Sequence, residues 1–157
     1  MADIRCSKPD VKYPLYETTV FEDFRIMTEN VAKKYPDRVA ISYKKNPKDK
    51  ETVKVTYKET RDYIRNMGTE LISMGCRDKH AALIGESSYE WICTYFSLMS
   101  IGAVVVPIDK DLPPADMSGI LNTAECEYVF YSKAIEAKIE EIKKDVPYLK
   151  TFICMGE

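Results

Sequence analysis

The sequence predicts an α/β fold in which a mostly parallel sheet, with helices on both faces, follows a β-hairpin. Four short apolar runs alternate with helical patterns, which is the order produced by a parallel sheet with crossover helices. These runs are apolar throughout, as is typical of strands buried on both faces. Before them, a polar turn containing Asn46-Pro47 separates two further strand-like segments.

The N-terminal part of the chain divides into an arm and a first helix. Residues 1–18 show no clear period and are expected to form an extended arm. A capping box of Thr19 and Glu22 then predicts the start of a helix. Pro36 ends it, because proline disfavours helical geometry in the residue before it. We therefore expect an N-terminal arm followed by one domain, at 19–157.

A hairpin and a second helix come next. The segments 39–43 and 52–56 are predicted to be antiparallel strands, since the second alternates polar and apolar residues as a half-buried strand does. A second capping box, formed by Thr56 and Glu59, opens a helix, and Gly75 ends it.

The rest of the chain alternates strands and helices. The four apolar runs lie at 81–85, 103–106, 127–131 and 151–154. Ser87 with Glu90 is expected to cap the helix after the first run, and Ser132 to cap the helix after the third. The helix at 89–101 is apolar almost all round, so we expect it to be deeply buried.

Composition narrows the class of protein. The 157 residues suit one domain, 45% are hydrophobic, and 23 basic against 25 acidic side chains disfavour a nucleic-acid binder with a broad basic surface. The five cysteines form no C-x-x-C pair, which favours free thiols in a reducing compartment. Without a signal-peptide pattern or an apolar stretch of about 20 residues, the chain is expected to be soluble and cytoplasmic.

Several catalytic and phosphate-binding patterns are missing from the sequence. Neither G-x-G-x-x-G nor G-x-x-x-x-G-K-[ST] occurs. The single histidine, His80, stands at the start of a strand, so we expect it to be structural. The acidic residues Glu125 and Glu127, and the pair Glu140-Glu141, are interpreted as solvated side chains.

Three longer stretches together resemble the N-terminal region of adenylate-forming enzymes. They are VTYKETRDYIRNMGTELISMG, ALIGESSYEWICTYFSLMSIGAVVVPID and DLPPADMSGILNTAECEYVFYS. An earlier stretch, TVFEDFRIMTENVAKKYPDRVAISY, is also similar to the family, so the resemblance covers about residues 19–156. ESSYEW and VVVPIDKDLP most resemble long-chain fatty acyl-CoA ligases. The chain departs from the family where Asp78-Lys79 replaces a common Gly-Asp pair and where Ser87 replaces a common Asn.

The resemblance implies the N-terminal portion of an ATP-dependent long-chain fatty acid–CoA ligase. Such an enzyme uses ATP and Mg²⁺ to form an acyl-adenylate, which coenzyme A converts to a thioester. The Ser/Thr/Gly-rich loop ending in Lys that would hold the triphosphate is absent. We therefore expect a truncated AMP-binding domain that has no catalytic residue, binds no cofactor and is inactive alone.

Substrate-binding candidates follow from sheet geometry. Ligands of open α/β sheets bind beyond the carboxyl ends of the strands. Those ends point to Glu86, Ser87 and Asp109, with no metal ligand among them. The competing interpretation is a helix cap for Ser87 and a turn for Asp109.

Two other functions remain open from the sequence. One is a complete flavodoxin-like module for a nucleotide or another small ligand, although such a module would not need the hairpin. The other is a non-catalytic interaction scaffold. As a truncated domain, the chain is also expected to self-associate through an uncovered sheet edge or the arm, which carries Tyr13, Leu15 and Tyr16.

Overall fold

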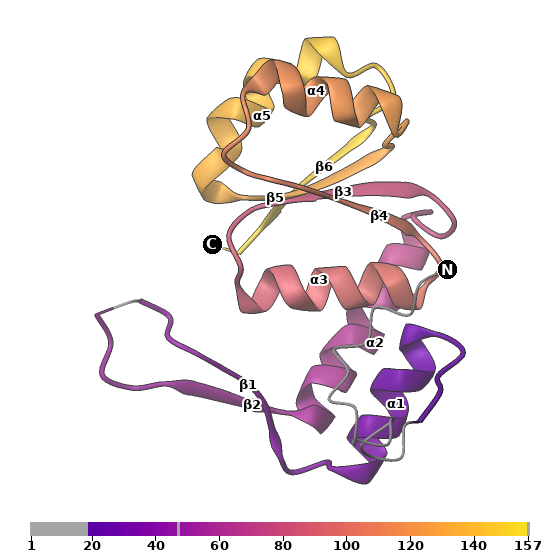
Figure 1. The fold of residues 1–157 in the computed structure, drawn as a ribbon, viewed down its shortest axis with the longest axis vertical. Helices are drawn as coiled ribbons and strands as arrows, with labels where there is room; N and C mark the ends of the chain where they lie inside the picture. Colours follow the sequence, from indigo (N-terminus) through magenta and orange to yellow (C-terminus); the bar gives the residue numbers. More distant parts are fainter. Residues whose placement is uncertain (1–18, 47, 157) are drawn as a thin grey trace, which may run out of the picture.

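The computed structural model describes residues 19–46 and 48–156, and the predicted arm at 1–18 lies outside the described residues. Two helices and a hairpin precede an alternation of strands and helices (Figure 1). The N-terminal elements are α1 (Phe24–Lys34), β1 (Val39–Tyr43), β2 (Val53–Thr56) and α2 (Tyr57–Ser73). The later elements are β3 (His80–Ile84), α3 (Tyr89–Ser100), β4 (Val104–Ile108), α4 (Pro114–Thr123), β5 (Tyr128–Ser132), α5 (Glu136–Ile142) and β6 (Thr151–Met155). Short 3₁₀ turns at Lys133–Ile135 and Lys143–Asp145 flank α5.

The predicted hairpin is confirmed. β1 and β2 pair antiparallel and extend away from the body of the molecule (Figure 1). The capping box at the start of α2 is confirmed as well. The Thr56 hydroxyl accepts from the Glu59 N–H at 3.2 Å, and the Glu59 carboxylate accepts from the Thr56 N–H at 2.8 Å.

The predicted capping box of Thr19 and Glu22 is wrong. α1 begins at Phe24, and Asp23 caps it by accepting from the Ile26 N–H at 2.7 Å. Asp and Thr are both good N-cap residues, so type alone does not choose between them. Asp23 is the one whose carboxylate reaches an N–H of the first turn.

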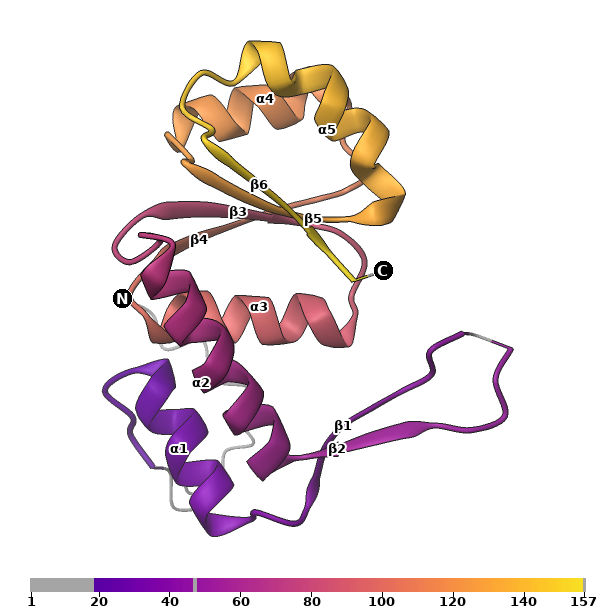
Figure 2. The ribbon, with the colours of Figure 1, turned by 180° about the vertical axis from the view of Figure 1, so that it is seen from behind.

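The four apolar runs form one parallel sheet, as predicted. Its strand order is β4-β3-β5-β6. α4 and α5 cover one face and α3 covers the other, while α1 and α2 pack on the far side of α3 (Figures 1 and 2). The sheet has a hydrophobic core on each face, and the side chains of successive residues in the central strands β3 and β5 point alternately into one core and the other. Ala82 and Val129 pack toward α4 and α5, whereas Leu83 and Phe130 pack toward α3.

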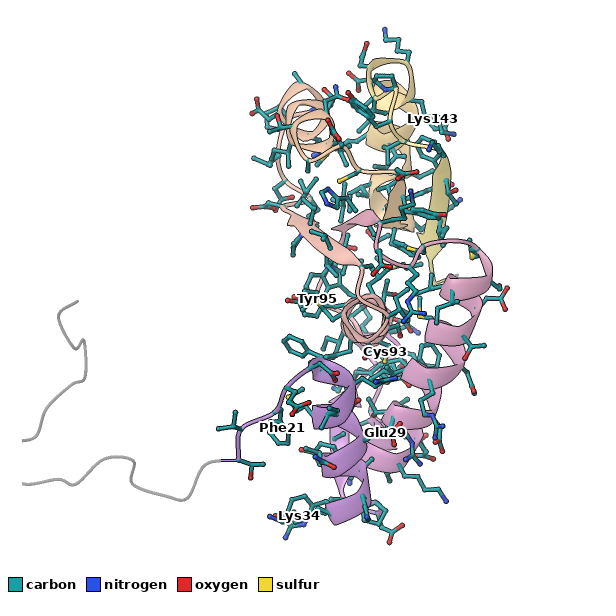
Figure 3. All side chains as sticks on the ribbon, turned by 90° about the vertical axis from the view of Figure 1, so that its right-hand side faces the viewer. Phe21, Glu29, Lys34, Cys93, Tyr95 and Lys143 are labelled. Atoms are coloured by element: carbon teal, nitrogen blue, oxygen red, sulfur yellow. The ribbon has the colours of Figure 1, made fainter. Side chains whose placement is uncertain are left out.

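The prediction that α3 is deeply buried holds for only part of the helix. Its fully buried residues include Thr94 and Ser97, and the Ser97 hydroxyl donates to the Cys93 carbonyl at 2.7 Å. Trp91 and Tyr95 stack at 5.5 Å between ring centroids but stay half-buried. Figure 3 shows Tyr95 on the side of α3 opposite α2. Among the described residues, no helix, α3 included, has the length and apolar character needed to cross a membrane.

The amino ends of three strands are joined by one carboxylate, which corrects the prediction that Glu127 is merely solvated. Glu127 lies just before β5. It accepts from Lys79, just before β3, at 2.7 Å and from Lys150, just before β6, at 2.6 Å. The Lys150 and Lys79 ammonium groups lower the pKa of Glu127 from 4.5 to about 2.

This ion pair predicts a pH-dependent stability. Because folding lowers the pKa of Glu127, its contribution is complete above the unfolded pKa and is lost as pH falls through the folded pKa. Wild type is expected to be more stable than Glu127→Gln at pH 7, and the difference is expected to shrink between about pH 5 and about pH 2. Urea denaturation at several pH values measures it. Glu141→Gln, on exposed α5 surface, is the control. A difference that does not vary with pH contradicts the prediction.

Candidate functional site

A crevice of about 760 Å³ opens at the carboxyl ends of β3, β5 and β6. The hairpin forms one side of it, and Figures 1 and 2 both show the hairpin and the end of β6 on the same side of the molecule. The polar lining residues that can contact a ligand are Tyr43, Lys44, Lys45, Glu86, Ser87, Ser88, Tyr89, Glu90, Ser132 and Lys133.

Glu86 and Ser87, two of the three predicted site residues, line this crevice. Both are exposed. The pKa of Glu86 is lowered, first by the nearby Ser132 hydroxyl, then by the backbone N–H of Glu86 and by Lys110. At neutral pH the Glu86 carboxylate is therefore ionised and can accept a hydrogen bond from a ligand. The Ser132 Oγ is itself buried and has no hydrogen-bond partner among the described residues. The predicted capping role of Ser132 is therefore wrong: a 3₁₀ turn separates it from α5, and its hydroxyl accepts no N–H of that turn.

Ser88, and not Ser87, caps α3. The Ser88 hydroxyl accepts from the Trp91 N–H at 3.1 Å, so the predicted capping role of Ser87 is wrong. The two serines are adjacent and chemically identical, and the backbone path from β3 decides which one reaches the first turn. Ser87 therefore faces the crevice without being needed as a cap.

The third predicted residue, Asp109, lies at the same edge of the sheet but is not among the residues that line the crevice. The parallel pairing of Ile84 with Ile108 places it beside the end of β3. Asp109 is exposed, and its carboxylate accepts from the Asp111 N–H at 2.9 Å. It thus organises the turn after β4, as the competing interpretation expected.

Three lysines that sequence reasoning did not place at the site also line the crevice. Lys44 and Lys45 come from the hairpin, which carries them beside the sheet, and Lys133 follows β5. Lys133 pairs with Glu136 at 2.6 Å, and this partner raises the pKa of Lys133. The rule that polar residues gather beyond strand ends could have identified Lys133, whereas Lys44 and Lys45 depend on how the hairpin packs.

Aromatic stacking fastens the hairpin to the crevice. Tyr43 of β1 stacks on Tyr89 at the start of α3, with 5.2 Å between ring centroids, and Tyr63 of α2 meets Tyr89 at 5.6 Å. Burial raises the pKa of Tyr89. The Cys93 thiol, one turn along α3, has its pKa raised to about 11 by burial, so it is protonated at neutral pH and is a poor nucleophile.

His80 is structural, as predicted. Its ring Nδ1 donates to the Ala124 carbonyl at the end of α4, which holds the imidazole away from the crevice. In the part of the chain that the structure describes, no three His, Cys, Asp or Glu side chains gather in a way that could hold a metal ion. The crevice itself is lined mainly by polar side chains, which carry charges of both signs.

The family model described as AMP-binding enzyme matches residues 28–156. The chain is 27% identical over 129 residues to a mycosubtilin synthase protein of Bacillus subtilis, covering 82% of this chain and 4% of the relative. It is 30% identical over 106 residues to long chain acyl-CoA synthetase 4 of Arabidopsis thaliana, covering 64% of this chain and 16% of the relative. The chain thus spans a small share of the length of both relatives.

Solved structures agree on the fold. The N-terminal domain of FACL13 from Mycobacterium tuberculosis superposes with a TM-score of 0.74 at 22% identity, covering 85% of this chain and 33% of that one. At this identity the likeness bears on the architecture alone. It places the sheet, its helices and the preceding hairpin in one known arrangement.

Proposed function

Because the chain belongs to the AMP-binding enzyme family, we propose that it is the N-terminal portion of an ATP-dependent ligase that joins a long-chain fatty acid to coenzyme A. The observation that carries this proposal is the family match, which extends from α1 to the end of β6. The similarity to an Arabidopsis long chain acyl-CoA synthetase supports the choice of acid. This family membership disfavours the flavodoxin-like alternative.

The proposed reaction has two steps. A carboxylate oxygen of the fatty acid attacks the α-phosphorus of ATP, and the bond to pyrophosphate breaks to leave an acyl-adenylate. The thiol of coenzyme A then loses its proton and attacks the acyl carbon, which releases AMP and leaves the thioester. ATP, Mg²⁺ and coenzyme A belong to the complete enzyme. Mg²⁺ offsets phosphate charge in such chemistry.

Among residues 19–46 and 48–156 we identify no site for the metal or the triphosphate. The described residues hold no cluster of metal ligands, and the sequence has no phosphate loop. We therefore assign no catalytic residue within this chain. Glu86 and Ser87 are proposed to contact substrate from the crevice, with Asp109 supporting the same edge. The proposed location is the cytoplasm.

A second candidate function has its own support. The similarity to the mycosubtilin synthase protein covers more of this chain than the Arabidopsis match does. An adenylation domain of a peptide synthetase activates an acid through the same adenylate, so the first step would be shared. The two candidates differ in the acid and in the thiol that receives it.

The experiment that tests the proposal uses the longest reading frame that contains this sequence. Purified protein is supplied with ATP, Mg²⁺ and hydroxylamine, which traps acyl-adenylates as hydroxamates. Palmitate, 4-hydroxybenzoate and a mixture of amino acids are compared. Palmitate-dependent hydroxamate, converted to palmitoyl-CoA when coenzyme A replaces hydroxylamine, supports the ligase. Activity with amino acids alone favours the second candidate, and no activity with any acid contradicts both.

The 157-residue chain is also expected to self-associate. Among the described residues, β4 and β6 are the outer strands of the sheet, and Val104 on β4 is 48% exposed. Unpaired N–H and C=O groups on such strands bind other strands, and exposed apolar residues strengthen the association. Light scattering is expected to give a mass above the 18.0 kDa of one chain, rising with concentration. A constant monomer mass from micromolar to millimolar protein contradicts this prediction.

A further inference from the structure

Three guanidinium groups line a groove that is distinct from the crevice. The groove, of about 560 Å³, lies between α1, α2 and the turn from α3 to β4. Arg25 projects from α1, Arg65 from α2, and Arg77 from the loop before β3. We call it the arginine groove. It meets the C-terminal end of α3, whereas the crevice meets the N-terminal end.

The elements that carry these arginines are held in place by other contacts. Glu29 of α1, which Figure 3 shows beside α2, accepts from Arg61 at 3.0 Å and lies 3.4 Å from the Arg65 guanidinium. This bridge couples α1 to α2. The position of Arg77 is set by the fully buried Cys76 before it, whose N–H donates to the Leu71 carbonyl at 2.9 Å. These contacts join the three segments that carry the arginines.

The charge of the groove is positive although the whole chain has a formal net charge of −2. Glu29 is its one acidic lining residue among the described residues, and Arg61 and Arg65 already share that carboxylate. Within 19–46 and 48–156, neither Arg25 nor Arg77 forms an ion pair. Guanidinium groups present several N–H donors in a plane, a geometry that suits phosphate oxygens.

The floor of the groove is apolar. It includes the buried residues Ile64, Gly68 and Ile101, with Ile72 on its wall. Gly68 lets α2 approach the end of α3, because a Cβ there would lie 3.3 Å from the Ile101 Cγ2. A ligand that matches both parts of the groove has a phosphate for the arginines and an apolar or flat group for the floor. The volume is within the range of small-molecule sites.

We propose that the arginine groove binds a soluble organic phosphomonoester, with the phosphate held between Arg25 and Arg77 and the organic group on the Ile64–Ile101 floor. The site is separate from the ligase chemistry proposed above and does not depend on it. Failure of the ligase assay would leave this proposal untouched, since binding is measured directly on the 157-residue chain.

The test is a titration of the ¹⁵N-labelled chain with phenyl phosphate at pH 7.5, followed by amide chemical shifts. Saturable shifts are expected at 25–30 and 64–77. Arg77→Gln and Arg25→Gln are each expected to weaken binding about tenfold, as the loss of a charged hydrogen bond does. Raising the salt concentration from about 0.05 M to about 0.5 M is expected to weaken it further. Phenol, which lacks the phosphate, is expected not to bind.

The matched control is Arg38→Gln. Arg38 is also exposed but lies over the Tyr35 ring, 4.9 Å from its centroid, and is not part of the groove. Its removal is expected to change the dissociation constant less than about twofold. If binding does not saturate at about 10 mM phenyl phosphate, the affinity is weaker than millimolar and the proposal is overturned. Equal weakening by Arg38→Gln, or shifts confined to Glu86–Glu90, also overturns it. The amide spectrum of each variant reports whether it is folded, and Arg25→Gln changes only an exposed helical side chain.

Discussion

Phe130→Ala is expected to destabilise the domain by about 3–5 kcal/mol. Phe130 lies on β5, a central strand, and is 1% exposed. Its ring packs with Leu83 and Leu98 in the core between the sheet and α3. Replacing the ring with a methyl group removes apolar contacts with both the sheet and α3. Because β5 is hydrogen-bonded to β3 on one side and to β6 on the other, its backbone has little freedom to move and close the cavity.

Guanidinium chloride denaturation of wild type and variant measures the change in the free energy of unfolding. Tyr148→Ala is the control, because Tyr148 is also aromatic but is 46% exposed. Its loss is expected to cost less than about 1 kcal/mol. A cost below about 1 kcal/mol for Phe130→Ala would mean that this core rearranges readily, which contradicts the packing described above.

The isolated 157-residue chain is expected to make no acyl-adenylate. The rate of pyrophosphate exchange with palmitate, ATP and Mg²⁺ is expected to equal that of a blank without protein. The physical reason is that adenylate formation needs backbone N–H groups and a cation arranged around the triphosphate, and the sequence contains no such loop. For the same reason, calorimetry is expected to detect no micromolar affinity for ATP.

A full-length fatty acyl-CoA ligase serves as the positive control for the exchange assay. Exchange above the blank that follows the chain through purification would contradict the prediction. It would mean that the crevice of Glu86, Ser87 and the neighbouring lysines performs the chemistry itself. Micromolar ATP affinity without exchange would contradict only the binding half.

Local pattern in the sequence was sufficient for most of the secondary structure. The apolar runs predict all four parallel strands, and the central strands β3 and β5 are buried as a strand covered on both faces is expected to be. The expected burial is wrong for the edge strand β4, where Val104 is exposed because no described strand lies beyond it. The Thr56–Glu59 capping box was predictable because both partners lie within one helical turn. The resemblance over residues 19–156 indicated the family because several local patterns of this kind occur in the same order as in that family. The structural role of His80 followed from its place at the start of a strand.

Interactions between residues distant in sequence were decided only by the tertiary structure. Glu127 joins Lys79 and Lys150 because the parallel pairing aligns three strand starts, and the hairpin brings Lys44 and Lys45 to the crevice through the stacking of Tyr43 on Tyr89. The arginine groove has the same origin, because three elements supply one guanidinium each. Periodicity reports which face of an element is apolar, but it carries no information about which elements become neighbours. Strand order and helix packing determine those neighbours, and with them the charge of each site.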